Sequence, residues 1–190
     1  MKTLKYLSAA MLVVFMAGFS SKAYSQEFFQ DRELTKKEKK EARKTQLYAN
    51  FKAIDTLLQN KTFVLEAQYL QDTYGSQVPV TSNLNFIRVD PQNVVMQTGT
   101  SSGMGYNGVG GVTAEGSLSN YKVSADEKHL SHTVTFSTIT QIGTYDVRML
   151  VGADATVTAS ITGLSRGRLT YRGNLVAPYN SRVFKGQRTN

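Results

Sequence analysis

The sequence predicts a mainly β protein, an antiparallel β-sandwich or open β-barrel of about eight strands preceded by one N-terminal amphipathic α-helix. Three observations support this fold class. From Phe63 onward, apolar residues recur at every second position in short runs. Turn-forming residues separate the runs, as in the stretch from Asp90 to Asn93. Before the runs, residues 31–60 contain many good helix formers and neither proline nor glycine.

The first 25 residues are expected to be a secretory signal peptide. A positively charged start leads into a short apolar run, and Ala23 and Ser25 then supply a small-x-small cleavage site. The run is shorter than the roughly 20 residues of a transmembrane helix. We therefore expect cleavage near Ser25/Gln26, no transmembrane segment in the mature chain, and a periplasmic, cell-surface or secreted location. The expected division is 1–25 signal peptide, 26–60 charged amphipathic helix and 61–190 β-rich domain.

Composition excludes several kinds of chemistry. The chain contains no cysteine, so it has no disulfide, thiol nucleophile, zinc–thiolate site or iron–sulfur cluster. Its formal net charge is +8, and basic residues gather in residues 31–61 and 161–190. Basic charge attracts anionic surfaces. Because we expect export, the candidate partners are an anionic lipid head group, an acidic glycan or an acidic protein of the cell envelope, and nucleic acid is not expected.

The predicted helix is amphipathic only in its second half. Thr35 and Glu38 fit a capping box at its start, and residues 36–44 are almost all charged. One apolar stripe follows, formed by Leu47, Phe51, Ile54 and Leu58. We expect the second half to dock on the β-rich domain and the first half to stand in water, with a basic tether to an anionic surface as the alternative.

Alternating apolar positions define the strand candidates. The apolar parity shifts after Ser119 and Asn120, which indicates a β-bulge. Residues 152–154 carry hairpin chemistry. The expected strands are Phe63 to Tyr69, Leu84 to Val89, Val94 to Gln97, Val112 to Val123, Leu130 to Phe136, Tyr145 to Val151, Ala155 to Ile161 and Leu169 to Leu175.

A glycine-rich stretch carries the spacing G-x-G-x-x-G at Gly103, Gly105 and Gly108. A dinucleotide site requires a helix directly after these glycines, because the helix N-terminus faces the pyrophosphate. Here strand alternation follows, so we expect neither a nucleotide nor any other cofactor. The long loop from residue 98 to 111 is expected to be flexible, or to form the rim of a binding site. The candidate rim residues are Gly103, Gly105, Tyr106, Asn107 and Gly108.

No catalytic or metal site is predicted. His129 and His132 are the only histidines, and in a strand their side chains point to opposite faces. His132 is therefore expected to be a buried imidazole bonded to a neighbour. Acids are sparse in the sheet region, Glu66 and Glu115 fall on water-facing positions, and no serine lies in a G-x-S-x-G motif. We therefore expect that the protein is not an enzyme.

Four arginines are predicted to share one polar face of the sheet: Arg148, Arg166, Arg168 and Arg172. We call this set the arginine face. Guanidinium groups bind carboxylates, phosphates and sulfates through paired hydrogen bonds. The face is therefore a candidate site for an anionic partner. The alternative is that its members pair with acids such as Asp146 or Glu115 on neighbouring strands.

Four stretches resemble the landmarks of the domain-of-unknown-function 4251 family: NGVGGVTAEGSLSNYKV (107–123), FVLEAQYLQDTYG (63–75), VTSNLNFIRVD (80–90) and NLVAPYNSRVFKG (174–186). The similarity spans about residues 47–186, and the first stretch is its most specific part. The resemblance implies a small exported envelope protein of gut-type Gram-negative bacteria with a single β-rich domain. It implies no activity, substrate or catalytic residue.

Three hypotheses for function follow. The first is a non-catalytic binding or interaction module of the cell envelope, which uses the glycine-rich loop and the arginine face. The second is a carrier of a lipid or other hydrophobic small molecule, which requires a barrel cavity lined by inward residues such as Phe136, Val147 and Tyr171. The third is a hydrolase, which requires two acids, or an acid and His132, in one cleft. The tyrosines that could line a cavity or stack on sugars are Tyr106, Tyr145, Tyr171 and Tyr179.

Overall fold

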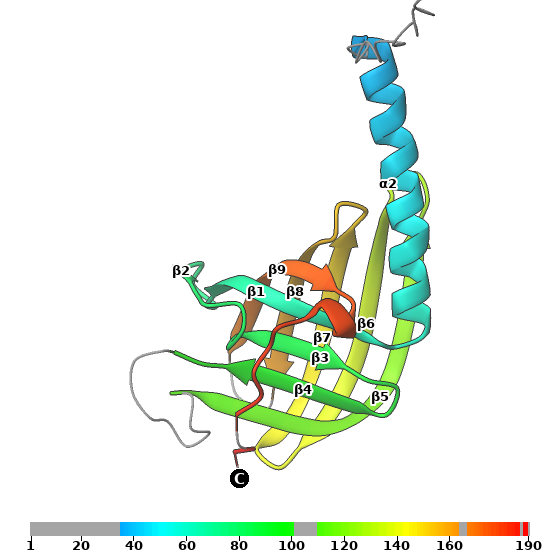
Figure 1. Cartoon of the computed structure of the whole chain (residues 1–190). Coiled ribbons are helices and arrows are strands. Elements are labelled where there is room, and N and C mark those ends of the chain that lie inside the picture. Colours follow the sequence, from blue (N-terminus) through cyan, green and yellow to red (C-terminus); the bar gives the residue numbers. More distant parts are fainter. Residues whose placement is uncertain (1–34, 101–109, 164–166, 187, 190) are drawn as a thin grey trace, which may run out of the picture. The chain divides into compact units, whose positions relative to one another are not determined.

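The computed structural model describes residues 35–100, 110–163, 167–186 and 188–189. Over these residues the chain forms one α-helix, nine β-strands and a short 3-10 helix (Figure 1). Their bounds are α2 Lys36–Gln59, β1 Phe63–Gln71, β2 Gln77–Pro79, β3 Phe86–Val89, β4 Asn93–Thr98, β5 Val112–Asp126, β6 Ser131–Thr140, β7 Gly143–Gly152, β8 Thr156–Gly163, β9 Arg168–Val176 and η2 Pro178–Asn180.

Strands β1 and β3–β9 form a closed antiparallel barrel. Each strand pairs with the next, and β9 returns to pair with β1, which closes the barrel at a seam that runs from the Val64–Val176 pair to the Gln71–Thr170 pair. The short strand β2 extends the sheet along the last residues of β1. The predicted mainly β fold with one N-terminal helix is confirmed. Of the two predicted architectures the barrel is correct, and it is closed rather than open.

The sequence predicted one β-bulge and one hairpin of the sheet, but not the register shift between Ala67 and Tyr69 where β1 pairs with β9. The register between β5 and β6 shifts between Ser119 and Lys122, which confirms the bulge. The β7–β8 hairpin turns at residues 153–155, where the Asp154 carboxylate accepts hydrogen bonds from the backbone N–H and the hydroxyl of Thr156. These local features fix the register, and the register decides which side chains enter the barrel.

The middle of the barrel is filled by apolar side chains. Every strand of the barrel contributes inward-facing residues, which pack as one cluster. Its buried members include Phe63, Leu65, Ile87, Val89, Val94, Val134, Phe136, Val147, Met149, Val151, Val157 and Ala159. Eight strands leave an interior that side chains can fill, and here they fill its centre.

Helix α2 packs beside the barrel at the end where β1 begins and β7 ends. Phe51, Ile54 and Leu58 are buried, and Ile54 and Leu58 belong to the barrel's core cluster. The hydroxyl of Tyr121 on β5 donates a hydrogen bond to the Leu58 carbonyl at 2.7 Å. The second half of the helix is therefore docked, as predicted, while its first turns extend beyond the strands (Figure 1). No helix among the described residues is long and apolar enough to cross a membrane.

The chain after β9 covers part of the barrel's outer wall, and we call residues 177–189 the C-terminal segment. Gln97 on β4 is fully buried beneath it. Its side-chain amide donates to the Phe184 carbonyl at 2.9 Å, and its side-chain oxygen accepts from the Gly186 N–H at 2.8 Å. Glu66 and Glu115 do face outward, but the segment engages both, through Ser181 and Lys185. The predicted outward parity of both glutamates is therefore correct, and the sequence did not reveal their contacts with the C-terminal segment.

Candidate functional site

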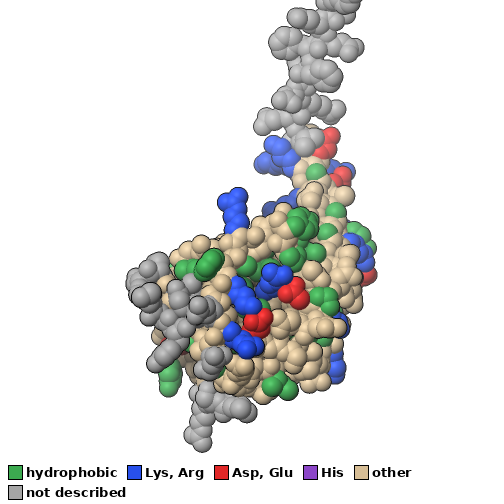
Figure 2. All heavy atoms as spheres, turned by 60° about the horizontal axis from the view of Figure 1, so that its bottom comes forward, with side chains coloured by type: hydrophobic (Ala, Val, Ile, Leu, Met, Phe, Trp, Pro, Cys, Tyr) green, Lys and Arg blue, Asp and Glu red, His purple; other side chains and the backbone are tan. Residues whose placement is uncertain are grey.

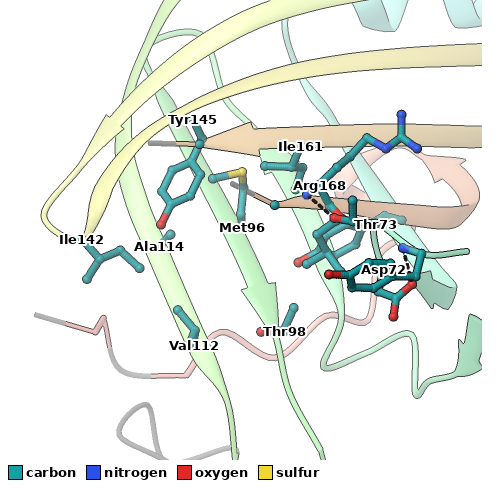
Figure 3. Close-up of a pocket in the computed structure, with 15 residues that line it drawn as sticks. Asp72, Thr73, Met96, Thr98, Val112, Ala114, Ile142, Tyr145, Ile161 and Arg168 are labelled. Carbon is teal, nitrogen blue, oxygen red and sulfur yellow. Dashed lines mark hydrogen bonds between the residues drawn. The ribbon is translucent and has the colours of Figure 1, made fainter. Parts of the chain in front are cut away.

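The barrel is hollow at the end opposite the docked part of α2. A pocket of about 440 Å³ lies among the ends of β1, β4 and β8 and the starts of β5, β7 and β9 (Figure 3). We call this end the mouth. Most of the side chains around the pocket are apolar. The aliphatic lining residues are Met96, Val112, Ala114, Ile142, Ile161 and Leu169.

Two small residues near the mouth, Ala114 and Gly163, leave room in the pocket. Ala114 faces the pocket opposite Met96, its partner on β4. At the end of β8, a Cβ atom on Gly163 would lie only 3.0 Å from the ring of Tyr145. The absence of a side chain at Gly163 therefore leaves room for that ring. Deeper in the barrel, phenylalanine and valine side chains fill the interior.

Two tyrosines that line the pocket, Tyr171 and Tyr145, differ in the hydrogen bonding of their hydroxyls. Tyr171 is buried and donates a hydrogen bond to the Gln97 carbonyl at 3.2 Å, and burial raises the pKa of its phenol. The ring of Tyr145 projects toward Ala114 and Ile142 (Figure 3). Its hydroxyl has no hydrogen-bond partner within the parts of the chain that the structure describes. Tyr145 therefore offers the pocket a hydroxyl that is free to bind.

A loop between β1 and β2, held by hydrogen bonds, forms part of the rim. The Asp72 carboxylate accepts hydrogen bonds from the N–H groups of Tyr74 and Ser76 at 2.9 and 2.8 Å, and Gly75 has a φ of +93°, which favours glycine. The Thr73 hydroxyl accepts from the Arg168 N–H at 2.7 Å, so the loop is fastened to the start of β9. The loop presents Tyr74, 94% exposed, at the rim.

The arginine face is spread over the outer wall of the barrel. Arg148, Arg168 and Arg172 are exposed there, and β8 separates Arg148 from the other two. In the β8–β9 register, Arg168 lies opposite Thr162 and Arg172 opposite Thr158. The structure thus places three of the predicted arginines on one wall without stacking them in a row. Arg166 lies outside the described residues.

The acids that were expected to neutralise the arginine face have other partners. Asp146 accepts a hydrogen bond from the Ser137 hydroxyl at 2.7 Å, and Glu115 pairs with Lys185 at 2.6 Å. Over the described ranges, Arg148, Arg168 and Arg172 make no ion pair. Their charges are therefore open to solvent or to a partner.

The residues on either side of the glycine-rich loop lie at the mouth. Its candidate rim residues, Gly103, Gly105, Tyr106, Asn107 and Gly108, lie outside the described residues. Thr98 and Val112, which flank the loop, both line the pocket. The strand that follows the glycines is β5, as predicted, and no helix follows them there.

The two histidines lie in different surroundings, as the strand parity predicted. His132 is fully buried, its ring stacks on Phe51 with centroids 4.4 Å apart, and its Nε2 lies 3.2 Å from Asp55 Oδ1 on α2 without the alignment of a hydrogen bond. His129 is exposed beside Asp126. Among the described residues, no group of three histidine or acidic side chains could hold a metal ion.

Burial makes the stability of the His132 contact depend on pH. Desolvation lowers the pKa of His132 from its usual 6.5, against the opposing pull of Asp55, and Lys52 lowers it further. Below pH 6.5 the unfolded chain therefore takes up a proton that the folded protein resists, so unfolding becomes easier as the pH falls. We therefore expect the melting temperature to drop between pH 7 and pH 5 on this account.

A calorimetric pH series on His132→Leu tests this expectation. The variant should lose that part of the pH dependence, because leucine does not titrate, while the exposed His129→Gln should keep it. An unchanged slope in His132→Leu would assign the pH dependence to other groups.

Comparisons with known proteins agree with the fold. The family described as a domain of unknown function (DUF4251) matches residues 45–175. The crystal structure of a DUF4251 family protein from Bacteroides eggerthii DSM 20697 is similar, with a TM-score of 0.60 and 27% sequence identity over 72% of this chain and 93% of that chain. No curated protein matches the chain.

Proposed function

Because the chain belongs to the DUF4251 family, whose description assigns no activity, we propose its function from the barrel itself: it binds a hydrophobic small molecule in the mouth, without transforming it. The observation that carries this proposal is the apolar pocket of about 440 Å³. Small-molecule sites typically span about 300–1,000 Å³ and have mostly apolar walls. Eight-stranded barrels of this size hold one such ligand in other proteins.

The lining supports binding more than catalysis. Asp72 is the only acid among the described lining residues, and one of its oxygens accepts two backbone N–H groups. The hydrolase hypothesis requires two acids, or an acid and His132, in one cleft. His132 does not line the pocket, since it lies against α2. What the pocket offers is apolar area, worth about 25 cal/mol for each Å² that a ligand buries.

The expected signal peptide supports a place for this function outside the cytoplasm, in the periplasm or at the cell surface. A carrier of hydrophobic molecules is useful in such an aqueous space, because free apolar compounds are poorly soluble there. The envelope interaction module ranks second. Its support is that Arg148, Arg168 and Arg172 are exposed and make no ion pair with any described residue.

Filling the pocket should abolish binding while leaving the barrel folded. Ala114→Phe places an aromatic ring in the chamber beside Met96. Added volume in a packed core usually costs 1–3 kcal/mol, but here it enters empty space. Titration with the fluorescent apolar probe N-phenyl-1-naphthylamine should give saturable binding to the parent protein and at least about tenfold weaker binding to the variant.

Two further variants make the result interpretable. Val112→Trp, at a half-exposed position of the same pocket, should weaken binding even if Ala114→Phe proves unstable. Leu150→Phe adds a ring on the outer wall, where Leu150 is 57% exposed, and should bind the probe like the parent protein. The proposal fails if the parent protein does not bind the probe, or if neither pocket variant changes the affinity.

A further inference from the structure

The charged residues at the pocket do not face its interior. Arg168 and Asp72 are the only charged residues among the described lining residues. Figure 3 shows the Arg168 guanidinium directed away from the wall formed by Met96 and Ala114. The Asp72 side chain lies in the β1–β2 loop, where it caps the N–H of Tyr74. The described residues thus place no fixed charge on the surface of the chamber between the strands.

A ligand charge inside this chamber would have no partner among the described lining residues. Moving an ionised group from water into apolar surroundings without a counter-charge costs several kcal/mol. The chamber's walls are aliphatic and aromatic side chains with a few hydroxyls. Hydroxyls satisfy hydrogen bonds but do not neutralise a charge. The walls therefore favour an uncharged ligand over a charged one of the same shape.

The polar groups that remain for a ligand are few and neutral. The Thr73 hydroxyl is bonded to the backbone of Arg168, and the Tyr171 hydroxyl to the carbonyl of Gln97. The Tyr145 and Thr98 hydroxyls both have no partner among the described residues, and both residues line the pocket. A ligand that presents one carbonyl or hydroxyl oxygen there would satisfy a group that is otherwise left to water.

We propose that the pocket takes an uncharged, mostly apolar molecule that carries a carbonyl or hydroxyl oxygen, and that Tyr145 donates a hydrogen bond to this oxygen. This inference rests on the proposed binding function and narrows it to one ligand class. It excludes fatty acids and other anionic amphiphiles as preferred ligands, although Arg168 lies at the rim and Arg148 and Arg172 are exposed on the outer wall.

A matched pair of probes tests the charge preference. N-phenyl-1-naphthylamine and 8-anilinonaphthalene-1-sulfonate share one ring skeleton and differ by a sulfonate. The neutral compound should bind to the full protein at least about tenfold more tightly, and Arg148→Gln, on the outer wall and outside the pocket lining, should leave both affinities unchanged. Equal or tighter binding of the sulfonate, lost in Arg168→Gln, would overturn the inference and place an anionic head group at the rim. If neither probe binds, the proposed function fails and this inference with it.

A second measurement tests the hydrogen bond. The neutral naphthalene dye 6-propionyl-2-dimethylaminonaphthalene carries a carbonyl acceptor, which N-phenyl-1-naphthylamine lacks. Tyr145→Phe keeps the ring and removes the hydroxyl. It should lower the affinity for the carbonyl dye about three- to tenfold and the affinity for N-phenyl-1-naphthylamine less than twofold. Tyr179→Phe removes a hydroxyl that is 86% exposed outside the pocket and serves as the control. An equal effect on both probes, or none on either, would contradict the role of Tyr145.

Discussion

The Gly173→Ala variant is expected to lose at least about 3 kcal/mol of unfolding free energy, or to fail to fold. Gly173 lies on β9 opposite Ala67 of β1, within the seam that closes the barrel. A Cβ atom there would collide with the Glu66 carbonyl oxygen and stand 2.8 Å from the Ala67 Cα. Both obstacles are backbone atoms, which cannot rotate away as a side chain can. The seam must therefore separate locally to admit a single methyl group.

Urea denaturation followed by fluorescence or circular dichroism measures this loss. Gly167→Ala is the matched control, because a Cβ at Gly167, just before β9, meets no atom within 4 Å. The control should lie within about 1 kcal/mol of the parent protein, as a substitution free of steric conflict does. A Gly173→Ala variant as stable as the control would contradict this prediction, because it would show that the seam can accommodate a methyl group at little cost.

The Phe51→Ala variant is expected to cost about 3–5 kcal/mol, the usual range for removing a buried aromatic ring. Phe51 is buried between α2 and the barrel, and its ring stacks on His132 with centroids 4.4 Å apart. Truncation leaves a cavity against β6 and removes the cover of a buried imidazole. The docked half of α2 should then be the first part of the molecule to unfold.

Tyr48→Ala gives the comparison for Phe51→Ala on the same helix. Tyr48 is 48% exposed and its ring lies 6.3 Å from that of Phe51, so its loss should cost less than about 1 kcal/mol. Helical circular dichroism and urea midpoints, measured together, distinguish loss of α2 alone from loss of the barrel. Equal midpoints for the two variants would argue that α2 contributes little to the stability of the barrel.

The sequence predicted the strands well because alternation is a local signal. Inward positions such as Val134 and Phe136 follow directly from it, and so does the bulge after Ser119. Closure was not predictable in the same way. Alternation tells which side of a strand faces inward, but the pairing of β1 with β9 joins residues that are distant in sequence. The alternation is therefore equally compatible with a sandwich and with a barrel, and the β1–β9 pairing distinguishes the two.

The C-terminal segment was missed for a related reason. Its residues show no periodicity, and η2 is its only regular element among the described residues. Gln97 is a polar residue on the outer parity of β4, which the sequence alone assigns to solvent. Only the four hydrogen-bond partners of its side chain, Leu84, Thr113, Phe184 and Gly186, show that it is buried. One buried amide thus organises a segment that carries no pattern of its own.

The pocket could be anticipated only in part. Of the three residues predicted to line a cavity, only Tyr171 lines the pocket. Phe136 and Val147 lie in the packed centre of the barrel. Parity places a residue inside or outside a barrel, but it does not give the depth along the barrel axis. Small residues near strand ends, such as Ala114 and Gly163, were the available signal for a hollow mouth.

The seam between β1 and β9 also fixes the order in which this protein can assemble. Strands β3 to β8 pair with their neighbours in sequence, and apart from the long connection between β4 and β5 they are joined by short turns, so these pairs can form as soon as both strands exist. The Val64–Val176 pair cannot form until almost the whole chain has been made. Throughout synthesis β1 therefore keeps an open hydrogen-bonding edge, and the nascent chain is exposed to intermolecular strand pairing until its last strand arrives.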